Sequence, residues 1–145
     1  MFNSGFNVLV KREVLRFLNL WKQTIMPGLI SSALYILVFG HALGSRIGRI
    51  ENISYMNYII PGLVMMSVIN HAYQNSSSSL MQAKFLKFLD DLLITPLSGL
   101  EISTAYIIGA SVRGIINGIM VILLSMALTG FTIDNLFLTL LFLVI

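Results

Sequence analysis

Two stretches of this chain are too long and too apolar for the surface helices of a soluble domain. Residues 24–44 contain no Asp, Glu, Lys or Arg, and residues 102–128 contain one such residue, Arg113. An α-helix rises about 1.5 Å per residue, so roughly 20 residues cross the ~30 Å hydrocarbon core of a bilayer. Charged residues make up 10% of the chain, whereas soluble domains carry about 25%. The sequence therefore predicts a helical integral membrane protein.

Two further apolar stretches complete the predicted bundle. Residues 58–80 begin apolar and become polar after Val68, and residues 136–145 are apolar but number only ten. Ten residues rise about 15 Å, which is half a bilayer. We therefore expect an all-α bundle with three complete membrane helices, at 24–44, 58–80 and 102–128, and a truncated fourth helix at 136–145. Residues 1–145 would then form the N-terminal part of one transmembrane domain.

The basic residues predict the orientation of this bundle. The segment before the first membrane helix carries four of them and the 81–101 loop two, whereas the 45–57 loop carries two and the 129–135 turn none. Loops rich in Lys and Arg stay in the cytoplasm. We expect a multi-pass protein of the inner (plasma) membrane with its N-terminus and its 81–101 loop in the cytoplasm. The net charge of +3 is too small to indicate nucleic-acid binding.

The segment at 6–23 has the pattern of an amphipathic helix. Val10, Val14, Phe17 and Trp21 recur at helical spacing, and Arg12, Arg16, Asn19 and Gln23 occupy another face. This pattern is typical of a helix that lies in the membrane interface, with basic residues toward anionic headgroups. The alternative is an amphipathic core helix of a soluble domain. The neighbouring membrane helices favour the interfacial helix, with membrane lipid as its partner.

The loop at 81–98 predicts a short cytoplasmic helix. Phe85, Phe88, Leu89 and Leu92 follow the i, i+3, i+4, i+7 spacing of one helical face, and Asp91 lies on the other side. Thr95-Pro96 should end this helix, because a residue before proline is displaced from the α region. Ser98 or Ser103 could cap the helix that follows. Lipid, the helix bundle or another protein could cover the apolar face.

A polar stripe marks the second membrane helix. Its residues recur at helical spacing and are Ser67, Asn70, His71, Gln74, Asn75 and Ser78. Polar groups that face lipid are costly, so this stripe should face protein or a watery pathway. Two interpretations stay open: hydrogen-bonded contact between helices, which is common, and the lining of a translocation path.

The third membrane helix combines a packing surface with one charge. Ala110, Gly114 and Gly118 form a row of small residues that permits close contact with another helix. Arg113 is expensive inside a bilayer, so it should snorkel toward the interface, or else face a partner or a cavity. Asn117, one turn away, is its nearest polar neighbour on the same face.

The sequence contains no signature of catalysis. It has no cysteine, no G-x-x-x-x-G-K-[ST], no H-E-x-x-H and no G-x-S-x-G. Its acidic residues are scattered among loops and segment ends. We therefore expect a protein that is not an enzyme, with no catalytic, cofactor-binding or metal-binding residue in this chain.

Two segments in their order along the chain resemble a known family. Residues 58–63 read YIIPGL, residues 92–98 read LLITPLS, and Glu101 follows. Together with an interfacial helix and a polar second span, this arrangement resembles the permease subunit of ABC-type-2 exporters over all 145 residues. One departure concerns residues 87–91, KFLDD, which lack the Gly-Thr of the R-E-x-G-T sequence that often precedes LLxTP in such helices. This departure leaves the substrate class open.

The resemblance implies how such a protein would work. The full subunit would have six membrane helices, and two subunits would join two copies of a separate ATPase, which binds the ATP and Mg²⁺. The helix at 81–95 would be the coupling helix, seated in a cleft of the ATPase. The residues that would serve this coupling are Phe85, Phe88, Leu89, Asp91, Leu92, Thr95 and Pro96.

The expected function is export of a drug-, lipid- or glycolipid-like amphipathic molecule, driven by ATP that the partner hydrolyses. One alternative is a polysaccharide-export permease of the same architecture, for which a row of aromatic residues along the path would be typical. The obvious candidates for that row are Tyr73 and Tyr106 alone. Another alternative is a membrane scaffold or assembly subunit without transport.

Overall fold

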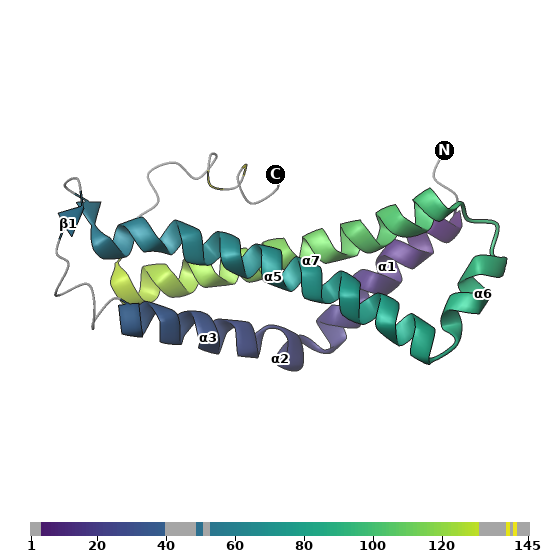
Figure 1. Ribbon diagram of the computed structural model, residues 1–145, viewed down its shortest axis with the longest axis horizontal. Coiled ribbons are helices and arrows are strands. Elements are labelled where there is room, and N and C mark those ends of the chain that lie inside the picture. Colours follow the sequence, from purple (N-terminus) through teal and green to yellow (C-terminus); the bar gives the residue numbers. More distant parts are fainter. Residues whose placement is uncertain (1–3, 40–48, 51–52, 131–138, 140, 142–145) are drawn as a thin grey trace.

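The fold is all-α, as the sequence predicts, apart from one pair of two-residue strands. The computed structural model describes residues 4–39, 49–50, 53–130, 139 and 141 (Figure 1). Its elements in chain order are α1 (Ser4–Asn19), α2 (Trp21–Thr24), α3 (Met26–Leu37), β1 (Arg49–Ile50), β2 (Ile53–Ser54), α5 (Tyr55–Phe85), α6 (Phe88–Ile94) and α7 (Gly99–Thr129). The strands pair antiparallel. Residues 40–44 of the first predicted span and most of the predicted helix at 136–145 lie outside the described residues.

The two longest helices, α5 and α7, have 31 residues each and lie side by side along the molecule (Figure 1). Ile60 and Val64 of α5 pack on Val121 and Ile122 of α7 near one end of this pair. Further along, a Cβ atom on Gly114 would lie 2.9 Å from the carbonyl oxygen of Val68. The close contact between α5 and α7 at this point therefore depends on a glycine at position 114.

The remaining helices cover this pair at its two halves. Helix α3 lies along the half that contains Ile60 and Val64, whereas α1 and α6 lie at the other half (Figure 1). Pro27 occupies the first turn of α3, where a missing backbone N–H costs nothing. Among the described residues, one helix, α7, is long and apolar enough to cross a membrane by length and composition. The prediction of three complete spans stays a prediction.

The predicted helix at 81–95 is wrong in its first part. Residues 81–85 continue α5, and the chain turns at Leu86 and Lys87 before α6 begins at Phe88. Lys87 adopts the left-handed conformation, with φ of 55°, which is uncommon for a residue with a side chain. Five residues of α5 therefore extend beyond the predicted end of the span at 80.

The end of α6 and the start of α7 follow from the LLITPLS segment and Glu101. Thr95 Oγ1 donates to the carbonyl oxygen of Leu92 at 2.6 Å, and Pro96 prevents the helix from continuing. Ser98 and Glu101 then form a reciprocal capping box, in which each side chain accepts from the other residue's backbone N–H. This segment therefore encodes a sharp and hydrogen-bonded corner between two helices.

Helix α1 packs on the bundle through a face that overlaps the predicted apolar face only in part. Its buried residues are Phe6, Leu9, Glu13 and Phe17. Phe6 and Leu9 join Leu92, Ala105 and Tyr106 in a second apolar core. Trp21, half exposed, and Leu18 lie outside this contact. Phe17 of the predicted face is buried and Val10 packs on this core, so the prediction holds in part. It left out the acidic Glu13, which lies in register with Leu9 and Phe17.

Candidate functional site

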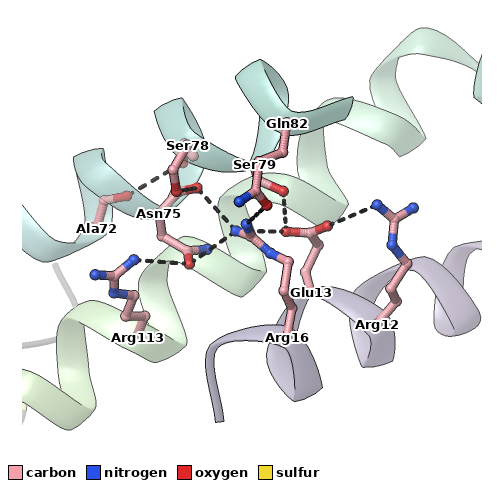
Figure 2. A network of polar contacts seen from close by, with 10 residues as sticks. Arg12, Glu13, Arg16, Ala72, Asn75, Ser78, Ser79, Gln82 and Arg113 are labelled. Carbon is pink, nitrogen blue, oxygen red and sulfur yellow. Dashed lines mark hydrogen bonds and ion pairs between the residues drawn. The ribbon is translucent and has the colours of Figure 1, made fainter. Parts of the chain in front are cut away.

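A buried carboxylate lies where α1 crosses α5 and α7. Glu13 has no exposed surface, and Ser79 Oγ of α5 donates to its Oε2 at 2.5 Å. The guanidinium nitrogens of Arg16 and Arg12 lie 3.5 and 3.9 Å from its two oxygens. Figure 2 shows these side chains converging between the helices. A buried charge is tolerated only when it is paired and hydrogen-bonded, and Glu13 is both.

Asn75 of α5 connects this carboxylate to α7. Its Oδ1 accepts from Arg16 and from Arg113, each at 3.4 Å, and the Asn75 side chain is fully buried (Figure 2). Arg16 also donates to Gln82 Oε1 at 2.9 Å. We call Arg12, Glu13, Arg16, Asn75, Ser79 and Arg113 the polar cluster. It joins three helices that are far apart in the sequence.

A glycine makes room for this cluster. A Cβ atom on Gly109 of α7 would lie 2.8 Å from Glu13 Cβ, which is closer than real Cβ contacts allow. Only a residue without a side chain lets α1 lie this near α7. Sequence reasoning missed Glu13 and Ser79. The available signal was that Glu13 falls on the same helical face as Phe6, Leu9 and Phe17.

The structure divides the predicted polar stripe of α5 into two parts. Ser67, His71 and Asn75 are buried, whereas Asn70, Gln74 and Ser78 are exposed. Asn75 belongs to the polar cluster and so makes contacts between helices. Ser67, Asn70, His71 and Gln74 instead line a groove between α3 and α5.

The groove between α3 and α5 has a volume of about 360 Å³. Gly28, Ser31, Ser32 and Tyr35 of α3 form its opposite wall, and the His71 imidazole lies directly against Gly28. Ser67 Oγ and His71 Nδ1 are buried and have no hydrogen-bond partner among the described residues. Buried polar atoms normally have partners, and the polar lining residues of α5 that are exposed to the groove are Asn70 and Gln74.

The predicted coupling residues divide into three that pack on the bundle and four that are exposed. Phe88, Leu89 and Leu92 face the bundle, where they pack on the apolar core formed with α1. Arg12 of α1 lies over the Phe88 ring, 4.0 Å from its centre, as in a cation–π contact. Phe85, Asp91, Thr95 and Pro96 are exposed. The apolar face read from the spacing is thus mainly covered by the protein's own helices.

A different set of apolar residues lies uncovered at this end of the molecule. Leu93 and Ile94 on the outer side of α6 are 67% and 83% exposed, and Phe85 and Leu86 before it are 77% and 78% exposed. We call these four residues the outer α6 surface. Contiguous exposed apolar residues of this kind mark an interaction surface.

The other predicted positions lie in the α5–α7 contact. Ala110, Gly114 and Gly118 are all buried on α7, and Gly114 touches Val68 and Ala72 of α5. Arg113 turns toward Asn75 in the bundle. Asn117 is buried and donates to the carbonyl oxygen of Arg113.

In the part of the chain that the structure describes, no three His, Cys, Asp or Glu residues gather in a way that could hold a metal ion.

Comparison with known proteins gives a consistent result. The profile of the family described as "ABC-2 type transporter" matches residues 4–145. The chain is 40% identical over 124 residues to the inner membrane transport permease YadH of Escherichia coli strain K12, which covers 86% of this chain and 48% of that protein. YadH proteins of Escherichia coli O157:H7 and Shigella flexneri match with the same identity and coverage. The chain thus spans about half the length of these relatives. No solved structure matches it.

Proposed function

Because this chain belongs to the ABC-2 type transporter family, a family of inner-membrane permeases, we propose that it couples a separate ATPase to export through α6. The observation that carries the proposal is the outer α6 surface. Leu93 and Ile94 lie in the only linker between the two longest helices of the described chain, and their side chains are largely uncovered. A partner that moves α6 would therefore move α5 and α7 directly.

Helix lengths support a cytoplasmic position for this surface. A helix of 31 residues is about 46 Å long, which exceeds the ~30 Å hydrocarbon core by the length of roughly 11 residues. The excess belongs at the polar end, which holds residues 75–85 of α5 and 99–109 of α7. In this placement α6, with the Lys84 and Lys87 that precede it, projects into the cytoplasm, as the basic residues predict.

The corner and the polar cluster explain how a movement of α6 would be transmitted. Leu92 packs in the core with α1. The capping box at Ser98 and Glu101 fixes the start of α7 a few residues after the end of α6. The cluster then ties α1 to both long helices. A movement of α6 would therefore displace α1, α5 and α7 together, because no long loop separates α6 from α5 or α7 in the described chain.

The groove between α3 and α5 supports an amphipathic substrate. Along α5 its wall begins with the apolar Leu63 and Met66 and continues with four polar residues, Ser67, Asn70, His71 and Gln74. A molecule with a polar head and an apolar body could satisfy both kinds of residue. Tyr35 is the single aromatic residue of the lining, which does not favour a polysaccharide path. The bilayer, the ATPase and a second copy of the permease are the partners in this proposal.

The test uses the full-length permease purified with its ATPase and reconstituted in vesicles. Leu93→Asp and Ile94→Asp should each abolish most stimulation of ATP hydrolysis by the permease, because a buried unpaired carboxylate at the contact is costly. Ser103→Asp, which adds the same charge at an exposed position of α7 outside the outer α6 surface, is the matched control and should leave the rate unchanged.

Two readouts decide the outcome. Co-purification of the ATPase should fall for Leu93→Asp and Ile94→Asp but not for Ser103→Asp. The thermal stability of the permease should stay the same, since Leu93 and Ile94 are exposed. Normal assembly and normal ATPase rates in both variants would show that α6 is not the coupling element. Leu92→Asp is unsuitable for this purpose, because it would disrupt the core.

A further inference from the structure

The polar cluster has an unbalanced charge. Arg12, Arg16 and Arg113 contribute three guanidinium groups, and Glu13 contributes the single carboxylate. Both ion pairs of Glu13 go to Arg12 and Arg16. Among the described residues, no carboxylate forms an ion pair with Arg113. The cluster therefore carries an excess of positive charge on three partly exposed arginines around the buried Glu13, Asn75 and Ser79, and unpaired charges are expensive where water is partly excluded.

Arg113 also keeps unused donors. Its Nη1 donates to Asn75 Oδ1, whereas its Nε is buried without a partner, and no described residue accepts from Nη2. Arg16 points at the same Asn75 oxygen, so two guanidinium groups lie on either side of one amide (Figure 2). Two like charges held this close repel each other, and an anion between or beside them would relieve the repulsion.

The depth of Arg113 identifies the kind of anion. If about 20 residues of each long helix span the hydrocarbon, counted from the Tyr55 and Thr129 ends, the cytoplasmic boundary falls near Asn75 and Gly109. Arg113 then lies about one turn inside this boundary, and an arginine side chain is long enough to reach headgroup phosphates from there. The exposed Trp21 and Leu18 beside the cluster are also typical of residues at the interface.

We propose that Arg113, assisted by Arg16, binds the phosphate group of an anionic phospholipid from the cytoplasmic leaflet. A guanidinium donates in a planar fork that matches phosphate oxygens, and the phosphate supplies the negative charge that the cluster lacks. The lipid would thereby fix α7 against α1 and α5 at the level where they leave the membrane. This inference rests on the membrane placement proposed above, but not on coupling to ATP.

The test measures binding of short-chain phosphatidic acid to the delipidated full-length permease–ATPase complex in detergent, by native mass spectrometry and by thermal shift. We expect Arg113→Gln and Arg16→Gln to weaken this binding about tenfold, the equivalent of about 1.4 kcal/mol. Lys84→Gln, which removes an exposed cation outside the cluster, should change it less than twofold. Inorganic phosphate and the matching diacylglycerol are the ligand controls.

Each outcome bears on the proposal. Strong binding of phosphatidic acid, weak binding of phosphate and of diacylglycerol, and loss in both arginine variants support a lipid phosphate site. Equal binding of inorganic phosphate would overturn the lipid as its source, and unchanged binding in the variants would overturn the site. If Arg113→Gln does not fold, Arg16→Gln and Arg113→Lys take its place. Arg113→Lys keeps the positive charge but removes the planar fork of donors. Unchanged binding of phosphatidic acid in both variants would overturn the site. Failed ATPase coupling with intact lipid binding would refute the proposed function alone.

Discussion

At the scale of single residues, Glu13 shows how much one buried charge can organise. It lies on the apolar face of α1, yet it is fully buried and takes part in one hydrogen bond and two ion pairs. Its three partners are on α1 and α5, and Gly109 of α7 lies against its Cβ atom. An acidic residue at this position would interrupt a simple amphipathic pattern. It can be buried here because Arg12, Arg16 and Ser79 surround it.

Glu13→Gln should lower the stability of the permease by about 1–3 kcal/mol, because it leaves two partly buried guanidinium groups without a counter-charge. The Ser79 hydroxyl keeps a hydrogen-bond partner in this variant, so the loss reports mainly the charge. Thermal unfolding of the full-length permease in detergent, scored as the apparent Tm, would measure it.

A double-mutant cycle with Arg16→Gln separates the pair from general damage. We expect Glu13→Gln and Arg16→Gln to be non-additive, with a coupling of about 1 kcal/mol or more. The exposed Lys11 serves as the control partner and should give additive effects. Additivity for the Arg16 pair would mean that the 3.5 Å contact contributes nothing measurable.

At the scale of helices, the contact between α5 and α7 depends on small residues. Gly114 sits against the backbone carbonyl of Val68 and the Cβ atom of Ala72, and Ala110 and Gly118 continue the same buried row. Backbone atoms cannot move aside as a flexible side chain can. The spacing of small residues predicts such a surface, whereas the partner helix is known only from the structure.

Gly114→Ala should separate α5 from α7 and cost about 1–3 kcal/mol, the usual penalty for overpacking. Gly62→Ala is the matched control, because a Cβ atom there meets nothing within 4 Å. The control should be neutral or more stable by up to about 1 kcal/mol, since alanine favours the helix. Equal apparent Tm values for the two variants would show that the helices do not pack as closely as this.

At the scale of the whole molecule, α5 and α7 are longer than a bilayer is thick, and their surplus length carries α6 and α1 at one end (Figure 1). This arrangement explains why α5 changes from apolar to polar residues along its length. The polar residues after Val68 belong in turn to the groove, to the polar cluster and, in the proposed membrane placement, to a cytoplasmic extension of the helix.

Cysteine labelling can test this placement, because residues 1–145 contain no cysteine. In a full-length permease made cysteine-free, Leu93→Cys and Ser103→Cys should react with a membrane-impermeant maleimide from the cytoplasmic side alone. Ile53→Cys should react from the periplasmic side. Leu123→Cys, which is exposed on α7 near its other end, should stay unlabelled because lipid covers it.

Labelling of Ile53→Cys from the cytoplasm would reverse the orientation. Protection of Ser103→Cys from both sides would instead show that the first turns of α7 lie inside the hydrocarbon, and the predicted span at 102–128 would then be the better assignment.

Properties that depend on local sequence could be predicted from the sequence. Apolar stretches without charge determine the helical membrane class, because isolated backbone polar groups are not tolerated in lipid. The Thr95-Pro96 stop and the Ser98–Glu101 cap act within a few residues, so the corner between α6 and α7 could also be read. The family resemblance rested on this same corner, whose hydrogen bonds are local, together with the YIIPGL segment at 58–63.

Properties that depend on which helix lies beside which face were decided by the tertiary structure alone. Periodicity identified an apolar face on 85–92, but three of its residues, Phe88, Leu89 and Leu92, pack on the core formed with α1. The uncovered residues are Phe85 of that face together with Leu86, Leu93 and Ile94. Likewise, the polar stripe on α5 does not by itself show what its residues contact. The structure shows that α3 forms a groove with one part of the stripe and that α1 brings Glu13 and Arg16 to the other part. Burial depends on which elements pack together, whereas periodicity describes each element by itself.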